Sequence, residues 1–247
     1  MCQKTPANAE WARPGSSSTC KVVSVLQSKF HPARDAAIAL GAALLFSWFA
    51  WLASLAGPGE FDTAGRAAVH ACAQPWLTSL MKAASQAGGG LVLWPCGVLI
   101  VGLLVFAHRG REAALFGAAV VGANLVSEAM KLFFHRPRPE AWFDYPLPST
   151  FSFPSGHAFV SFCFFLCLAE ILVRDEWRPA ARFAVWSAAL ACTFTIGLSR
   201  VYLGVHYPTD VLGGYAAGIL WTTLIRAAHN ATQRRAGRKS QGIGTRR

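Results

Sequence analysis

An apolar run of membrane-spanning length ends in a cluster of cations in residues 113–139, which read AALFGAAVVGANLVSEAMKLFFHRPRP. A helix of about 20 apolar residues crosses the hydrocarbon core of a bilayer, and the part up to residue 134 meets that length. Four polar side chains interrupt the run at helical spacing and therefore share one face: Asn124, Ser127, Glu128 and Lys131. Alone, this stripe fits a structural polar seam, with Glu128 paired to Lys131, as well as it fits a functional site.

Five further apolar runs flank this one. The six runs are Ala36–Ala56, Gly89–Ala107, Ala113–Phe134, Ala158–Val173, Phe183–Leu198 and Val211–Ala228. Charged residues make up only 14% of the 247 residues, whereas a soluble domain carries about 25%. The fourth and fifth runs are slightly short, and they span if their helices continue into the polar residues beside them. The sequence therefore predicts an all-α integral membrane bundle of six transmembrane helices.

The basic residues are distributed unevenly between the two sides of such a bundle. With a cytoplasmic N-terminus and six spans, 17 of the 23 Lys and Arg residues lie in cytoplasmic segments. That asymmetry follows the positive-inside rule. The six on the outer side are Arg66, Lys82, Lys131, Arg136, Arg138 and Arg200. We expect a protein of the cell (inner) membrane with both termini in the cytoplasm and with its polar site on the extracytoplasmic side.

The two ends of the chain differ in composition from the apolar middle. Residues 1–34 are rich in Ser, Pro and Ala and have no apolar core of signal-peptide length, which predicts a flexible polar leader. Residues 35–229 form the predicted membrane domain, and residues 230–247 form a basic cytoplasmic tail. The net charge is +11, but the basic ends carry no aromatic stacking platform, so we expect no nucleic-acid partner. The sequence does not indicate an oligomeric state.

Polar residues gather where the predicted third to sixth helices end. The stretch after the third run carries Arg138, and Pro154-Ser155-Gly156-His157 comes directly before the fourth run. The predicted fifth helix ends in Ser199-Arg200, directly after the fifth run, and His206 and Asp210 precede the sixth. Polar groups near membrane segments are costly and therefore indicate function. We expect a site at the outer helix ends.

These residue types suit the binding of a phosphate group. Lys131, Arg138 and Arg200 can surround its oxygens, and guanidinium groups bind them in bidentate fashion. Ser155 and the amides around Gly156 begin a helix, where the N–H groups and the helix dipole attract anions. Gly156 has no side chain, which lets the backbone approach the phosphate closely.

The two histidines and the aspartate supply the reaction chemistry. Asp210 lies one helical turn beyond His206 and can hold one ring N–H, which leaves the other nitrogen free to attack phosphorus. His157 can protonate the leaving oxygen and later activate water. A two-histidine, one-carboxylate metal site from His157, His206 and Asp210 is the alternative. Because three cations at the same place would repel a divalent metal, we expect neither a metal nor another cofactor.

These residues resemble the signature of the type 2 phosphatidic acid phosphatases, the lipid phosphate phosphatase superfamily. Three motifs carry the resemblance: a lysine followed after six residues by Arg-Pro, the tetrapeptide Pro-Ser-Gly-His, and Ser-Arg followed by histidine and aspartate at fixed spacing. They occur in this order at Lys131 with Arg138-Pro139, at Pro154–His157, and at Ser199, Arg200, His206 and Asp210. The resemblance implies a six-helix bundle in which His206 is the nucleophile, Asp210 orients it and His157 is the general acid. It also implies that Lys131, Arg138, Ser155, Gly156 and Arg200 bind phosphate.

Other residues near the motifs are expected to play lesser parts. His135 and Arg136 lie inside the first motif but outside its fixed positions, so we expect them to face water or lipid head groups. The segment Gly57–Gly88 mixes apolar and polar residues, which favours short interfacial helices. Glycines in the helices are expected to permit close packing rather than to bind a ligand. They include Gly117, Gly122, Gly213, Gly214 and Gly218.

The sequence predicts a phosphatase that hydrolyses a lipid phosphomonoester or diphosphate through a phosphohistidine, with the bilayer as its surroundings. Isoprenyl diphosphate is slightly favoured over phosphatidic acid, phosphatidylglycerol phosphate and lipid A phosphates. Two alternatives share the chemistry: a lipid phosphotransferase that uses an alcohol in place of water, and an enzyme like the vanadate-dependent haloperoxidases. A channel or non-catalytic scaffold is disfavoured, because buried cations without an anion are costly.

Overall fold

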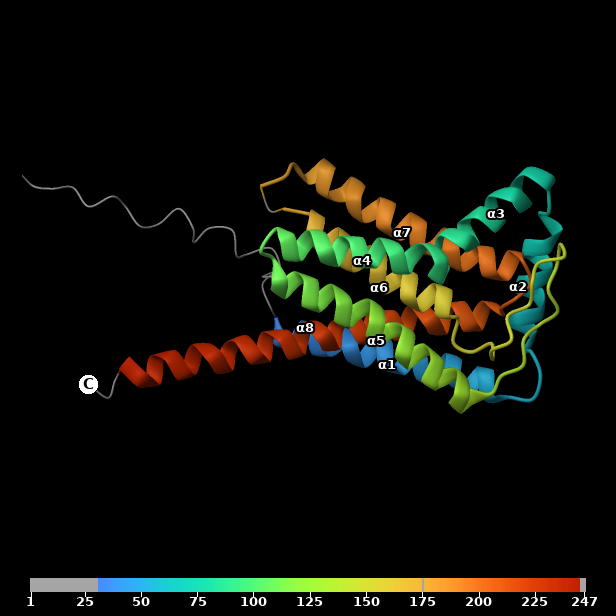
Figure 1. Cartoon of the computed structure of the whole chain (residues 1–247). Coiled ribbons are helices and arrows are strands. Elements are labelled where there is room, and N and C mark those ends of the chain that lie inside the picture. The colour runs from blue at the N-terminus through green and yellow to red at the C-terminus, as the bar shows by residue number, and fades with distance from the viewer. Residues whose placement is uncertain (1–30, 175, 245–247) are drawn as a thin grey trace, which may run out of the picture.

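The protein is described here by a computed structural model that covers residues 31–174 and 176–244, with side chains up to residue 232. Within those ranges every regular element is an α-helix (Figure 1). The helices are α1 (Pro32–Ser54), α2 (Glu60–Ala71), α3 (Pro75–Ala87), α4 (Gly90–Phe106), α5 (Gly110–Phe134), α6 (Gly156–Leu172), α7 (Pro179–Tyr202) and α8 (Pro208–Gly244). The prediction of an all-α fold is confirmed.

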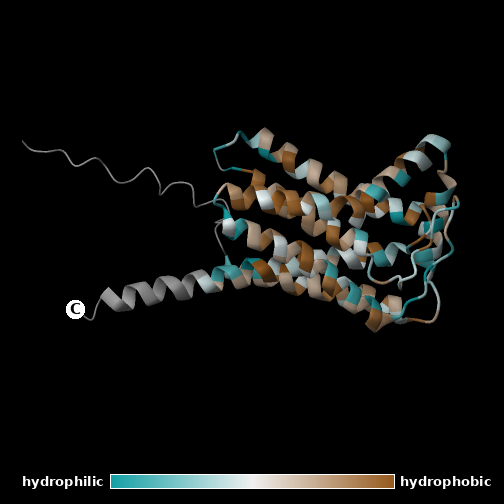
Figure 2. Cartoon of the chain, viewed as in Figure 1, coloured by the Kyte–Doolittle hydropathy of each residue, from teal (hydrophilic) through white to brown (hydrophobic). Residues whose placement is uncertain are grey.

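Each of the six apolar runs corresponds to one helix, namely α1 and α4 to α8. Four of them, α1, α5, α7 and the first 25 residues of α8, are long and apolar enough to cross a membrane. The α3–α4 pair bends by 46° and qualifies as a fifth span if the two helices are counted together, whereas α6 is a shorter apolar helix of 17 residues. Hydrophobic residues dominate the length of the bundle, and hydrophilic ones gather towards its ends (Figure 2). Large apolar side chains face outward, as lipid-facing ones do.

The predicted short helices of the segment Gly57–Gly88 are present as α2 and α3. Figure 1 shows α2 lying across one end of the bundle, beside the loop that joins α5 to α6. Proline starts α3 and also α8, where its fixed φ suits the first helical turn. At the same end α5 stops because His135 takes a left-handed conformation, with φ of 48°, and Pro137 follows two residues later.

Helix α6 lies at the centre of the bundle and packs against α4, α5, α7 and α8. Small residues let α8 come close: a Cβ on Gly214 would lie 2.8 Å from the backbone oxygen of Ser155, and one on Gly218 would lie 2.6 Å from the Phe162 ring. The packing role predicted for the helical glycines is confirmed at these positions, whereas a Cβ on Gly117 would meet nothing within 4 Å. The tight α6–α8 contact places the start of α6 beside the start of α8.

The structure describes part of the predicted N-terminal leader and part of the predicted C-terminal tail. Helix α1 begins at Pro32, inside the last residues of the predicted leader, and residues 1–30 lie outside the described part. Helix α8 continues through the predicted tail as far as Gly244 and extends beyond the other helices in Figure 1.

Candidate active site

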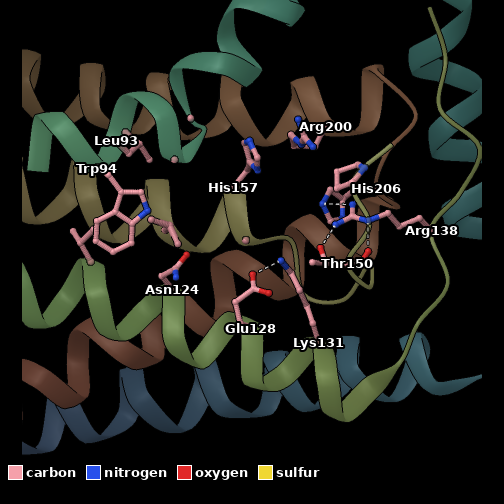
Figure 3. A pocket seen from close by; sticks show the side chains of 16 residues that line it. Leu93, Trp94, Asn124, Glu128, Lys131, Arg138, Thr150, His157, Arg200 and His206 are labelled. Carbon is pink, nitrogen blue, oxygen red and sulfur yellow. Dashed lines mark hydrogen bonds and ion pairs between the residues drawn. The ribbon is translucent and has the colours of Figure 1, made fainter. Parts of the chain in front are cut away.

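A cavity of about 200 Å³ opens at the end of the bundle where α5 and α7 finish and α6 and α8 begin. Six of the eight predicted site residues line it: Lys131, Arg138, Gly156, His157, Arg200 and His206. Figure 3 shows the side chains of Arg138, His157, Arg200 and His206 near one another, with Lys131 on the facing helix. The other two, Ser155 and Asp210, lie directly behind this wall and are fully buried.

The His206 ring is held between a carboxylate and a guanidinium. Its Nδ1 lies 3.3 Å from Oδ2 of Asp210, and its Nε2 lies 3.0 Å from Nη1 of Arg138. A carboxylate only accepts and a guanidinium only donates, so the ring carries its proton on Nδ1 and its lone pair on Nε2. Burial lowers the pKa of His206 to about 3, and Arg138 adds to this effect while Asp210 opposes it. The ring is therefore neutral at pH 7, with its unprotonated nitrogen on the side of Arg138.

Asp210 is fixed by several donors besides His206. Its Oδ2 accepts a hydrogen bond of 2.8 Å from the backbone N–H of Tyr207 and one of 2.5 Å from the hydroxyl of Ser152. Its Oδ1 accepts one of 2.6 Å from Nη1 of Arg136. A carboxylate with this many donors has little freedom to rotate, so it orients the imidazole firmly.

The three cations approach the cavity from different elements. The Lys131 ammonium is paired with Glu128 at 2.7 Å, as in the seam interpretation, while it also lines the cavity. Arg138 is anchored by the backbone oxygens of Thr150, at 2.6 Å, and Val205, at 2.9 Å. Burial and the nearby Arg200 lower the pKa of Arg138 to about 10, which shows that its charge lacks full compensation. Crowded cations of this kind favour an anion between them.

Arg200 is held by residues outside the three motifs. Its Nη1 donates to the hydroxyl of Ser85 in α3 and, at 3.3 Å, to that of Tyr145 in the α5–α6 loop. The two hydroxyls also contact each other at 3.0 Å. Sequence reasoning missed both residues, because each lies more than 50 positions from Arg200 and belongs to no recognisable pattern.

The start of α6 offers hydrogen-bonding groups to the site. Ser155 is the N-cap of α6, yet its hydroxyl makes no capping hydrogen bond. Within the described part of the chain, Ser155 Oγ, Ser127 Oγ and Arg200 Nε are buried and have no hydrogen-bond partner. A Cβ on Gly156 would lie 3.3 Å from Nζ of Lys131 and 3.2 Å from Ser127 Oγ, so a larger residue would crowd the cation. These groups suit the oxygens of a bound anion.

The expectation that Arg136 faces water or lipid head groups is wrong. Its side chain is buried, donates to Asp62 and Asp210, and stacks its guanidinium 4.3 Å from the centre of the Tyr207 ring. His135, by contrast, is exposed as expected. A buried arginine needs carboxylate partners, and one of them, Asp62, lies in α2, where no motif marked it.

The cavity continues away from the cations along an apolar wall. Leu93 and Trp94 of α4, Val120 of α5 and Val160 of α6 form this wall. In Figure 3, Leu93, Trp94 and Asn124 lie at the opposite side of the cavity from Arg138 and His206. The site is therefore amphiphilic, cationic at one end and apolar at the other.

Among the described residues, no group of three or more His, Cys, Asp or Glu side chains is placed to hold a metal ion. In the alternative donor set of His157, His206 and Asp210, both ring nitrogens of His206 are already engaged, Nδ1 by Asp210 and Nε2 by Arg138.

Comparison with known proteins identifies the family. The model of the PAP2 superfamily matches residues 112–234, which include all three motifs. Phosphatidylglycerophosphatase B of Bacillus subtilis is 33% identical over 189 residues, which are 74% of this chain and 91% of that protein. Lipid A 1-phosphatase of Rhizobium johnstonii is 34% identical over 117 residues, which are 44% of this chain and 43% of that protein.

Among solved structures, a transmembrane PAP2-type phosphatidylglycerolphosphate phosphatase from Bacillus subtilis superposes with a TM-score of 0.67 at 29% identity. The match covers 77% of this chain and 96% of that one. The apolar helices of this chain, together with its membrane relatives, show that it is an integral membrane protein. The chain belongs to the PAP2 superfamily and is a phosphatase of that family.

Proposed function

We propose that this PAP2 phosphatase hydrolyses a phosphomonoester or diphosphate of a membrane lipid through a phosphohistidine on His206. The observation that carries the proposal is the amphiphilic cavity. Three cations and the Nε2 face of His206 meet at one end, and the apolar wall of α4, α5 and α6 begins beside them. Such a cavity suits a substrate whose phosphate and apolar part are adjacent.

In the first step, Lys131, Arg138 and Arg200 hold the non-bridging phosphate oxygens, joined by the Ser155 hydroxyl and the amide of Gly156. Nε2 of His206 attacks phosphorus, the bond between phosphorus and the lipid oxygen breaks, and His157, protonated once the phosphate anion lies between the cations, gives its proton to that oxygen. The His206 ring becomes a phosphorylated cation, which Asp210 stabilises through Nδ1–H. The surrounding cations stabilise the charge on the transferring phosphoryl group.

In the second step, a water molecule replaces the lipid. Neutral His157 removes a proton from the water as its oxygen bonds to phosphorus, and the bond from phosphorus to Nε2 breaks. Inorganic phosphate leaves, and both histidines return to their starting protonation states. The proton given to the lipid oxygen in the first step is thus replaced by one taken from water in the second.

We place the site at the extracytoplasmic face of a cell membrane, in a bundle of six spans with both termini in the cytoplasm. Two observations support this arrangement. The six apolar runs all form helices; α4 and α6 have 17 residues each, and α4 qualifies as a span when it is counted together with α3. The uneven distribution of Lys and Arg favours the side of the α8 extension as the cytoplasmic one.

The proposed function is tested by phosphate release from purified, detergent-solubilised protein. The panel contains phosphatidylglycerol phosphate, phosphatidic acid, an isoprenyl diphosphate and a lipid A 1-phosphate, each with excess chelator and with an alcohol acceptor in a parallel assay. Release in chelator is the expected result, and the ranking of the four lipids names the substrate. Loss of release that returns with added zinc or magnesium overturns the metal-free mechanism, and transfer to the alcohol in preference to water assigns a phosphotransferase.

Replacing Arg200 by lysine is expected to lower kcat/KM by about 10²-fold, because a point charge does not reproduce the guanidinium fork and its contacts with Ser85 and Tyr145. Steady-state kinetics on the best lipid of the panel measure the loss. Arg174→Lys is the control, since Arg174 is exposed and pairs only loosely with Glu176, at 4.0 Å. Near-normal turnover by Arg200→Lys would show that Arg200 does not bind the phosphate in the proposed way.

A further inference from the structure

A buried ion-pair network lies behind Asp210, on the side away from the cavity. Arg136 donates from Nη1 to Asp210, at 2.6 Å, and from Nη2 to Asp62, at 2.6 Å. Nη1 also donates to the hydroxyl of Thr209, at 2.8 Å. The side chains of Arg136, Asp62 and Asp210 are exposed by 4%, 2% and 0%. One guanidinium therefore bridges two carboxylates in a region closed to water.

Asp62 links this network to the start of α8. Its Oδ1 accepts a hydrogen bond of 2.9 Å from the backbone N–H of Thr209, and its Oδ2 accepts one of 2.8 Å from the Thr209 hydroxyl. Backbone N–H groups in the first turn of a helix have no partner within that helix. A carboxylate from α2 thus caps α8 one residue before Asp210, in the role that an N-cap side chain usually plays.

Arg136 is tied to the other support of Asp210 as well. Its backbone oxygen accepts a hydrogen bond of 2.9 Å from the N–H of Ser152, whose hydroxyl donates to Asp210 Oδ2. The loop therefore delivers two donors to the same carboxylate, one to each oxygen. Burial opposes the charge of Arg136, but the two carboxylates outweigh it and raise its pKa.

We propose that Arg136 and Asp62 are positioning residues, which fix the carboxylate of Asp210 and through it the tautomer of His206. The proposal rests on the proposed function, in which Nε2 of His206 must carry a lone pair. Oδ2 of Asp210 receives the His206 ring at 3.3 Å, and Arg136 holds the opposite oxygen. Without Arg136, Oδ1 of Asp210 loses its charged donor and the carboxylate is held through Oδ2 alone, so the orientation that favours the Nδ1–H tautomer is less firmly fixed. Because Asp62 lies in α2, the helix across the end of the bundle, this network makes the orientation of Asp210 depend on the position of α2.

Three variants separate positioning from support of the fold. Arg136→Gln removes both ion pairs, and Asp62→Asn keeps the size and one oxygen acceptor, for the Thr209 N–H, but removes the charge. The double variant removes the guanidinium together with the Asp62 charge, so that fewer buried charges lack partners. Arg109→Gln is the matched control, because Arg109 also pairs with a carboxylate and donates to a backbone oxygen, at the far end of α5.

We expect Arg136→Gln to lower kcat by about 10- to 100-fold, the loss found when a partner that orients a metal-ligating histidine is removed, which is a comparable positioning role. KM and the inhibition constant of inorganic phosphate are expected to stay close to wild type, because Lys131, Arg138 and Arg200 remain. The kcat of Arg136→Lys should lie between that of wild type and that of Arg136→Gln, since an ammonium keeps the charge but does not bridge two carboxylates in fixed geometry. The double variant is expected to recover thermal stability without recovering kcat.

The decisive readout is the ring of His206 itself, followed by ¹⁵N NMR of histidine-labelled protein in detergent and assigned by loss of its signal in His206→Asn. Wild type and Arg109→Gln should show one tautomer with the proton on Nδ1, whereas Arg136→Gln should show a mixture. An unchanged tautomer in Arg136→Gln overturns the proposal, and so does a double variant with wild-type kcat. Because the NMR measurement needs no turnover, an inactive wild type would reject the proposed function and leave this inference to be decided by the spectrum.

Discussion

Replacing His206 by alanine is expected to lower kcat on the order of 10⁵-fold or more, the scale of loss when a catalytic nucleophile is removed. The reason is positional as well as chemical. His206 is the imidazole whose Nδ1 is held by Asp210, at 3.3 Å, and whose Nε2 points to Arg138, at 3.0 Å. His157 has a different place, at the start of α6, and does not substitute for the missing ring. Phosphate release under saturating lipid measures the effect.

The control for this variant is His135→Ala, because His135 is an exposed histidine beside the same loop. It is expected to turn over like wild type. The variant is expected to keep the fold, and size-exclusion chromatography and thermal unfolding in detergent check this. Residual turnover of a tenth or more of wild type by folded His206→Ala would show that another group attacks phosphorus.

The second large effect is expected for Asp210→Asn, with a loss of about 10⁴-fold in kcat, as for a triad aspartate that sets the tautomer of its histidine. Asparagine has the same shape, but its amide presents a donor as readily as an acceptor. With N–H groups facing Nδ1, the His206 proton moves to Nε2, and the nucleophilic lone pair is lost. Arg136 also loses one of its two carboxylate partners.

Measurement of kcat and of phosphate inhibition separates this effect from a general loss of the site. The phosphate inhibition constant should change little, because Lys131, Arg138 and Arg200, the cations proposed to bind phosphate, are untouched. Asp144→Asn is the comparison, since Asp144 lies in the α5–α6 loop. If Asp210→Asn retains most of its kcat, the orienting role of Asp210 is wrong.

The sequence predicted the helical fold because its apolar runs are long and its charges cluster between them. Each run forms a helix, including α6, which is too short to qualify as a span by length alone. The bend between α3 and α4 was not predicted. At this bend Gly88 lies against Ile196 of α7, where a Cβ would come within 2.3 Å of the side chain. That contact is long-range and leaves no periodic signal.

The candidate site was predictable where local order carries it. His206 and Asp210 are one helical turn apart, and Ser155 and Gly156 adjoin His157, so their proximity follows from the chain itself. Arg136, in the α5–α6 loop, was misjudged because its burial depends on Asp62, which lies 74 residues away in α2. Ser85, whose hydroxyl meets Arg200, is 115 residues from it. Contacts that form only through tertiary packing leave no pattern in a single sequence, so they could not be predicted from it.

The central claim, that phosphate passes through His206, is tested most directly by trapping the intermediate. Enzyme mixed with a radiolabelled lipid phosphate is quenched within milliseconds in alkali, which preserves phosphohistidine, and the labelled peptide is identified by mass spectrometry. His157→Ala, in which the water step is slowed, serves to raise the trapped fraction. The account predicts label on His206 in both proteins and none in His206→Ala. Label on another residue, or rapid turnover without any labelled protein, would contradict it.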